Sequence, residues 1–563
     1  MITSLERGLL AKLRGIVGRK HVLTADRTTR AFRKGYRYGD GKVLAVVRPG
    51  TPREQFEAFK ACIDAGAIVI PQAANTGLTG GSTPDGNYDR PVVIINTLRI
   101  KGIHPIRDGQ QVVCLAGATL YELERILAPL EREPHSVIGS SCIGASVVGG
   151  VCNNSGGALV VRGPSYTEYA LFARVTEDGR VELVNHLGMV ADPSDLVLLD
   201  RLASGRFTSA DFALNERAAS SHGYAEKVRD IDAPTPARFN ADPDRLFEAS
   251  GCAGKVMVIA VRLDTFPRTL HSNTFYIGTN DTAELSRLRR TILAEFRELP
   301  VSGEYIHRGA FDIAAIHGKD VFLAIERFGT DRLPALFALK NKIDTLAAYA
   351  GFRGNLSDRL MQWASTLFRQ HLPTRMLEWR DRYEHHLILK MAGPGVDEAR
   401  TLLNTVFPST SGDYFECTEL EAHKAFLHRF AVAGAAIRYR AIHAAEVGEI
   451  VALDVALRRD DRDWFEVLPP ELHCRIANAL YYGHFFCHVL HQDYVLRSGV
   501  DPIALEHDMW RILDQRGAEY PAEHNAGHLY PAKESLRNHY RALDPGNHLN
   551  PGIGKTSRKH CWH

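Results

Sequence analysis

The chain has 563 residues, of which 45% are hydrophobic and 24% charged. This usage is typical of a globular protein and excludes a disordered or fibrous one. Lys and Arg number 68 against 66 Asp and Glu, so the formal charge is only +2. A dedicated nucleic-acid binder is more basic, and we therefore expect no nucleic-acid partner.

Length, cysteine usage and hydropathy limit the architecture further. At about 100 to 200 residues per domain, the length predicts two to four domains. The nine cysteines are scattered and contain no C-x-x-C, which indicates a reducing compartment. No window approaches the roughly 18 to 20 apolar residues of a membrane span, so we expect any membrane association to be peripheral. The charged, amphipathic N-terminus predicts a first helix rather than a signal peptide.

From 42 to 171, short apolar runs alternate with helical stretches such as PREQFEAFKACIDAG, which predicts an α+β or α/β domain. The strand-like AIVIP runs straight into AANTGLTGGS, and GSSCIGASVVGGVCNNSGG follows about 60 residues later. Such loops present backbone N–H groups that can cradle a diphosphate. The first loop contains neither G-x-G-x-x-G nor G-K-[ST], which excludes an ordinary Rossmann or ATPase loop. Two of them in one domain indicate one long ligand.

The second half begins with new elements. Residues 190–250 are polar and loop-like, whereas HSNTFYIGTN predicts a strand and TAELSRLRRTILAEF a helix. The last 45 residues are rich in Gly, Pro, Asn and His, which is typical of a chain end that lines a site. We therefore expect three segments: 1–266, which binds the ligand; 267–520, which forms a cap or substrate domain; and 521–563, which returns to the site.

The order of these motifs resembles a known superfamily. AANTGLTGGS, then SSCIGASVVGGVCNNSGG, then SGCAGKVMVIAVRL, resembles the flavin-binding domain of the vanillyl-alcohol oxidase, or PCMH-type, flavoproteins, and LNPGIGK looks like their terminal N-P-G-K. Within it, SVIGSSCIGAS, FLHRFAVAGAAIRY and PAEHNAGHLY resemble the quinone-linked respiratory D-lactate dehydrogenases of bacteria over essentially the whole chain. The resemblance implies an α+β fold with a two-lobed FAD-binding domain and an α+β cap.

The resemblance also implies the cofactor and its contacts. FAD is expected to be noncovalent, because the first loop contains no His to which some relatives tether the flavin. Val258 matches the adenine-side position, which binds through its backbone. The other implied FAD contacts are Ala73, Ala74, Asn75, Thr76, Gly77, Gly81, Ser82, Gly139, Ser146, Gly156 and Asn550.

The C-terminal half supplies candidate acid and base groups. Glu523 and His524 match a Glu-His pair in which the Glu is a metal ligand and the His a base. Oxidation of a 2-hydroxy acid requires a group that takes the hydroxyl proton, and an imidazole suits that task. His484 and His491 match an H-x6-H metal segment of related D-2-hydroxy-acid dehydrogenases. An odd separation puts them on opposite faces of one unbroken strand, so only a helix, bend or bulge would unite them, and a metal-free site stays open.

Two arginines correspond to the basic substrate positions of the relatives. Arg429 ends a predicted helical stretch, and Arg438 and Arg440 alternate with apolar residues on a predicted strand. A guanidinium can hold a small acid by its carboxylate in a bidentate pair. Arg429 and Arg438 are therefore the expected carboxylate clamp, with an ordinary surface salt bridge as the alternative for each.

The segment 327–382 carries ten basic and five acidic residues with interleaved Trp, Phe and Leu. Such a segment suits an anionic phospholipid surface, although a helical packing face with solvated charges has the same composition. The resemblance favours membrane docking. It implies a peripheral protein on the cytoplasmic face of the bacterial inner membrane.

The combined prediction is a respiratory flavoenzyme that oxidises D-lactate to pyruvate and passes electrons to membrane quinone. His524 is the expected base, and His484, His491 and Glu523 would bind a divalent metal if one is present. The alternatives are a dehydrogenase of another D-2-hydroxy acid, such as 2-hydroxyglutarate, and a flavin-binding protein without turnover.

Overall fold

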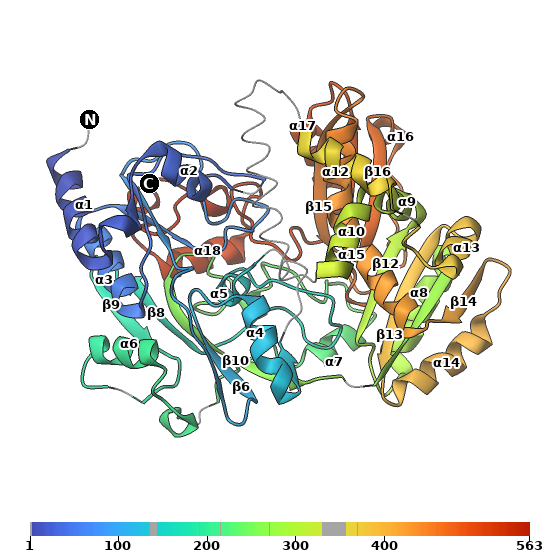
Figure 1. Cartoon of the computed structure of the whole chain (residues 1–563), viewed down its shortest axis with the longest axis horizontal. Helices are drawn as coiled ribbons and strands as arrows, with labels where there is room; N and C mark the ends of the chain where they lie inside the picture. The colour runs from blue at the N-terminus through green and yellow to red at the C-terminus, as the bar shows by residue number, and fades with distance from the viewer. Residues whose placement is uncertain are drawn as a thin grey trace.

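The computed structural model shows a molecule with two lobes (Figure 1). One lobe holds the N-terminal half of the chain together with its C-terminal end, and the other holds the residues between them. Helices and strands are mixed, which confirms the predicted α+β class. The structure describes all residues except 1–2, 36, 136–143, 191, 214–215, 270, 329–355 and 369.

The first sheet leads directly into the first glycine-rich loop. Three of its four strands run parallel, and the parallel strand at the edge of the sheet ends at Gln72, immediately before that loop. The predicted N-terminal helix is confirmed and begins with a capping box between Thr3 and Glu6. Leu13 and Phe59 bring two helices onto the sheet. The sheet order is β1 (Val22–Leu23), β2 (Ala45–Val47), β4 (Val92–Asn96), β3 (Ile68–Gln72), with helices α1 (Ser4–Val17), α2 (Asp26–Arg33) and α3 (Pro52–Asp64).

The second sheet is antiparallel and carries the second glycine-rich loop on its face. A short helix, α5, packs against the sheet through Val147 and Val151, and the loop continues from its end. The strands are β5 (Ile103–Ile106), β6 (Gln111–Leu115), β7 (Arg132–Pro134), β8 (Ala170–Val175), β9 (Val181–Asn185) and β10 (Met257–Pro267), and the helices are α4 (Leu120–Leu127), α5 (Val147–Cys152), α6 (Asp195–Ser204) and α7 (Tyr224–Arg229).

The third sheet forms the middle of the second lobe and is antiparallel between all its described neighbours. Its order is β14 (Gly412–Glu416), β11 (Ser272–Thr279), β13 (His385–Ala392), β12 (Ser302–His307), β16 (Ile476–His484), β17 (Val489–Arg497), β15 (Val447–Ala456). The predicted strand HSNTFYIGTN is β11, and the predicted helix TAELSRLRRTILAEF is α8.

Helices cover both faces of the third sheet, so its strands are buried on both sides. One core cluster includes apolar residues of α8 (Thr282–Glu295), α14 (Gly395–Val406) and α17 (Pro502–Gln515). The opposite cluster includes residues of α9 (Arg308–His317), α10 (Lys319–Phe328), α13 (Thr374–Arg382) and α15 (Glu419–Ile442). The remaining helices of the described chain are α12 (Leu356–Thr366), α16 (Pro470–His473) and α18 (Glu534–Leu543).

Helix α15 corrects one prediction. Arg438 and Arg440 lie in this single helix, not on a strand, and Arg429 lies within it rather than at its end. Thr418 and Glu421 form a capping box that starts the helix, and the alanine-rich AVAGAA segment favours its continuation. The alternation around Arg438 was therefore too short to indicate a strand.

The C-terminal segment returns to the first sheet. Val69 of β3 donates its N–H to the carbonyl of His548 and accepts one from Asn550. Lys255 is fully buried beneath this segment and binds Asn547 and the Leu549 carbonyl. The chain end therefore lies next to the strand that carries the first glycine-rich loop.

Much of the expected membrane segment, including Arg353 and Arg369, lies outside the described residues. Two of its described cations face carboxylates of the protein itself, because Arg375 pairs with Glu421 and Arg380 with Asp312. Those arginines are therefore less available to lipid than their charges imply. Among the helices of the described chain, none has the length and apolarity needed to cross a membrane.

Candidate active site

The first glycine-rich loop presents a row of free backbone amides. Within the described chain, no N–H between Ala74 and Ser82 donates to another backbone carbonyl. A side chain added at Gly77 would meet nothing within 4 Å, whereas one at Gly80, where φ is +75°, would lie 2.7 Å from the Tyr38 carbonyl. Asn75 holds the loop through the Lys34 carbonyl. The loop is thus fixed by the protein on one side and open at Gly77.

The C-terminal segment supports this loop from behind. Asn550 is fully buried and donates to the carbonyls of Gly81 and Ala253. Thr79 donates its hydroxyl to the Asn525 carbonyl. These bonds tie the loop to the segment that carries Glu523 and His524. The other predicted contacts of the first loop, Ala73, Thr76 and Ser82, lie in the same partly exposed stretch.

The second glycine-rich loop meets the predicted acid-base pair. Ser146 accepts a hydrogen bond from the Gly149 N–H and caps α5. A side chain at Gly156 would lie 2.4 Å from Glu523 Oε1, so only glycine fits there. Gly139 lies outside the described residues. Val258 is buried in β10, and its carbonyl accepts a hydrogen bond from the Gln55 side chain.

A β-hairpin brings His484 and His491 together. His484 ends β16, the chain reverses through a short 3-10 turn, and His491 lies on β17 opposite Tyr482. The two imidazole rings are 5.2 Å apart between centroids. Although His484 and His491 are seven residues apart, the reversal places both rings on the same face of the sheet, because they lie on two antiparallel strands. Ligand atoms of His484, His491 and Glu523 all lie within 4.8 Å of one another.

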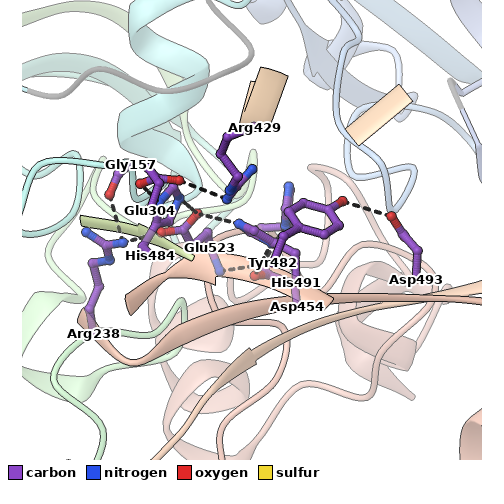
Figure 2. Close-up of polar contacts among 11 residues, drawn as sticks. Gly157, Arg238, Glu304, Arg429, Asp454, Tyr482, His484, His491, Asp493 and Glu523 are labelled. Atoms are coloured by element: carbon purple, nitrogen blue, oxygen red, sulfur yellow. Dashed lines mark hydrogen bonds and ion pairs between the residues drawn. The ribbon is translucent and has the colours of Figure 1, made fainter. Parts of the chain in front are cut away.

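Each histidine is oriented by a carboxylate on the neighbouring strand (Figure 2). Glu304 lies opposite His484 and approaches its Nδ1 at 2.7 Å, and Asp454 lies opposite His491 with its Oδ1 3.2 Å from Nδ1. With Nδ1 as the donor, both Nε2 lone pairs face Glu523 Oε2, at 3.5 and 4.0 Å. Lone pairs that converge in this way fit a divalent cation.

The electrostatics of the cluster favour positive charge between the ligands. Burial acts to raise the pKa of Glu523, but Arg238 and His484 outweigh it and lower that pKa to about 2. Burial acts to lower the pKa of His484, but Glu304 and Glu523 raise it to about 10. The same carboxylates that attract a proton to His484 would attract a metal ion.

His524 lies beside the cluster and is better exposed than the ligands. Its side chain is 33% exposed, and its Nδ1 lies 2.6 Å from Asp454 Oδ2. Burial acts to lower the pKa of His524, but the neighbouring Asp454 carboxylate raises it overall. With Nδ1 bound to the carboxylate, Nε2 is the nitrogen available to accept a proton.

The two predicted clamp arginines are separated. Arg429 lies over the Tyr482 ring at 4.6 Å and pairs with Glu304 at 3.0 Å, so it belongs to the cluster (Figure 2). Arg438 lies nine residues further along α15, about 13 Å along its axis, and pairs with Asp320 and Asp358. The structure therefore does not bring Arg438 to this cluster, and of the two arginines predicted to bind the substrate carboxylate only Arg429 lies there.

Sequence reasoning missed three residues that complete the cluster. Asp454 interrupts the apolar run IVALDVA, a signal that could have identified it, whereas the strand SGEYIH is too mixed to distinguish Glu304. Arg238, in the stretch predicted as polar loop, is 1% exposed and bonds both Glu523 and the Gly157 carbonyl. No local pattern distinguishes Arg238, because its role depends on contacts distant in the sequence.

The two loops fit a flavin dinucleotide. Free amides of the first loop suit diphosphate oxygens, and the second loop packs on Glu523, so a ligand that spans both would reach the histidine cluster. An electron acceptor, a proton acceptor and a carboxylate-binding cation would then adjoin one another. That arrangement can remove hydrogen from a small hydroxy acid.

Comparison with known proteins agrees with this chemistry. Residues 43–184 match the family model described as an FAD binding domain, and residues 274–562 match the model described as D-lactate dehydrogenase, membrane binding. The chain thus has an FAD-binding domain and a membrane-binding one, which confirms the predicted cofactor and membrane association.

Curated relatives match over the full length. The quinone-dependent D-lactate dehydrogenase of Haemophilus influenzae is 56% identical over 98% of this chain and 99% of its own. That of Escherichia coli is 55% identical over 100% and 99%. Among solved structures, p-cresol methylhydroxylase with substrate bound has a TM-score of 0.57 at 13% identity, over 99% and 98% of the two chains, which confirms the PCMH-type fold. The chain belongs to the family of quinone-dependent D-lactate dehydrogenases.

Proposed function

We propose that this protein oxidises D-lactate to pyruvate and delivers the electrons to membrane quinone. The observation that carries the proposal is the position of His524 and Arg429 beside the His484, His491 and Glu523 cluster, with both glycine-rich loops adjoining it through Gly156 and Thr79. The family membership supports the substrate and the acceptor.

The chain would divide the reaction among a few side chains. Arg429 binds the substrate carboxylate, as a guanidinium does in a charge-assisted pair. His524 accepts the hydroxyl proton on Nε2 while the hydrogen on C2 leaves as hydride. Bound FAD supplies the hydride acceptor and the relay of two electrons to quinone. Pyruvate is the product that remains.

His484, His491 and Glu523 would hold a divalent metal. Two imidazoles and one carboxylate match the donor set of a catalytic zinc site, and open positions would admit the substrate oxygens. A cation there would lower the pKa of the hydroxyl and fix its orientation. Chelation should silence the enzyme, and added Zn²⁺ or Mn²⁺ should restore it. A metal-free preparation with full activity would show that the reaction needs no metal, and the role of His524 as the base would stand.

The membrane contact is proposed for α12 and its neighbour α9. Leu360, Trp363 and Leu367 recur at helical spacing, and with Phe368 and Ile316 they are between 57% and 69% exposed. Gln362 donates to the Ile316 carbonyl, so these side chains lie on adjoining elements. Lys319 donates to the Phe368 carbonyl, so a cation adjoins this exposed apolar patch, and the combination suits an anionic phospholipid surface. We place this surface on the cytoplasmic face of the inner membrane.

We also propose three segments: 1–266 binds FAD, 267–520 forms the cap with the membrane segment 327–382, and 521–563 returns to the flavin. The change of sheet between β10 and β11 supports the first boundary, and the contacts of Asn550 with the first loop support the last segment.

An anaerobic titration tests the function. D-lactate should bleach the flavin absorbance of the purified protein, L-lactate should not, and a soluble quinone should restore the colour. Faster bleaching by D-2-hydroxyglutarate would assign another acid. No bleaching by any 2-hydroxy acid would leave a flavin-binding protein without turnover.

A further inference from the structure

We propose that Asp454 is a positioning residue that orients a metal ligand and the base with one carboxylate. This inference rests on the proposed function, because it names the residue that orients the imidazole rings of His491 and His524 for their proposed roles. Asp454 lies on β15 and is 7% exposed.

The contacts of Asp454 account for both oxygens. Oδ2 accepts from His524 Nδ1 at 2.6 Å and from the Glu523 N–H at 2.7 Å. Oδ1 lies 3.2 Å from His491 Nδ1 and has no other hydrogen-bond partner among the described residues. Three donors on two oxygens are within the capacity of an ionised carboxylate. They also fix the backbone at Glu523, so the carboxylate holds a second ligand through its main chain.

The chemistry of the two histidines requires a carboxylate at this position. Donation from Nδ1 leaves Nε2 of His491 free for a metal and Nε2 of His524 free for a proton. An asparagine offers one acceptor oxygen and an NH₂ group that repels an Nδ1–H. One imidazole would then turn or change tautomer, although the size of the side chain is unchanged.

Glu304 provides the contrast within the same cluster. It orients His484 in the way that Asp454 orients His491, but its second oxygen pairs with Arg429 and not with the base. Loss of Glu304 should therefore affect the metal and the substrate carboxylate. Loss of Asp454 should affect the metal and proton transfer.

The test compares Asp454→Asn with Glu304→Gln in the FAD-loaded protein. Equilibrium dialysis against Zn²⁺, read by elemental analysis, should show metal affinity lowered by about 10- to 100-fold in both variants. At saturating metal, Asp454→Asn should reduce its flavin slowly with little change in the KM for D-lactate. Glu304→Gln should recover most of the rate and show a raised KM.

A double variant separates orientation of the base from general damage. If Asp454 acts through His524, Asp454→Asn with His524→Ala should be no slower than His524→Ala at saturating metal, because the two side chains act as one unit. If the double variant loses the product of the two single losses in rate, the inference is overturned. It is also overturned if Asp454→Asn reduces its flavin as fast as the parent. Flavin content and melting temperature identify a misfolded variant, and Asp454→Ser then replaces it, with the same expectation.

Failure of the proposed function looks different. If the parent binds no Zn²⁺, the metal assignment fails, but the comparison of the double variant with His524→Ala still decides the role of Asp454. If D-lactate does not bleach the parent while another 2-hydroxy acid does, the same rates are measured with that acid.

Discussion

Substitution of Arg438 tests whether this residue stabilises the fold, as its ion pairs indicate, or binds the substrate, as the sequence predicted. Arg438→Gln removes the guanidinium that pairs with the carboxylates of Asp320 and Asp358, and all three side chains are buried, at 8% to 12% exposed. Loss of one partner from a buried ion pair costs about 3 to 5 kcal/mol. For a cooperative unit of about 150 to 250 residues, that loss lowers the melting temperature by roughly 6 °C or more.

Two other variants of α15 complete the experiment. Arg440 pairs with Glu449 at the surface, where such a pair is worth about 1 kcal/mol or less, so Arg440→Gln should melt with the parent. Arg429→Gln should raise the KM for D-lactate by about 10- to 100-fold, the loss expected for a hydrogen bond to a charged group. Arg438→Gln should leave that KM unchanged.

Thermal unfolding followed by tryptophan fluorescence, with steady-state kinetics at several D-lactate concentrations, distinguishes the two roles. Arg438→Gln with the parental melting temperature and a raised KM would refute the reasoning. That result would indicate that Arg438 binds the substrate carboxylate.

Three further outcomes are expected. Gly77→Val should abolish FAD binding without lowering the melting temperature of the flavin-free chain, since a Cβ at this position meets no protein atom within 4 Å. Flavin retention equal to that of the parent would contradict the assignment of this loop to FAD. Burial raises the pKa of Glu506 to about 7, whereas in the unfolded chain this carboxyl loses its proton near pH 4.5. The folded chain therefore holds the proton more tightly, and the free energy of unfolding falls as pH rises between these two values, by up to about 3 kcal/mol. Glu506→Gln should therefore raise the melting temperature at pH 8 more than at pH 5. The nearby Lys555 acts in the opposite direction on the pKa of Glu506, and Tyr38 and Tyr530 also lie near this carboxyl. Equal increases in melting temperature at the two pH values would show that Glu506 does not titrate between them. Trp363→Ser with Leu367→Ser should release the protein from anionic vesicles, whereas Val467→Ser, at a still more exposed position outside the patch, should not. Vesicle binding retained by the double variant would show that the membrane contact lies elsewhere.

The sequence by itself determined the features that depend on neighbouring residues. A run of small residues after a strand leaves backbone amides uncovered, so the first loop could be predicted to bind phosphates before any fold was known. Capped helices such as α1 and the adjacent Glu523-His524 pair are local in the same sense. These features need only short-range sterics and hydrogen bonding.

Only the tertiary structure decided how the site is assembled. Glu304, Asp454 and His484 come from three strands far apart in the sequence, and antiparallel register places each carboxylate opposite a histidine. The hairpin unites His484 with His491, which spacing alone left open. Arg438 was lost from the site because nine residues of helix carry it about 13 Å from Arg429. Register and helix rise act over distances that a local pattern does not record, and they determine which charges meet.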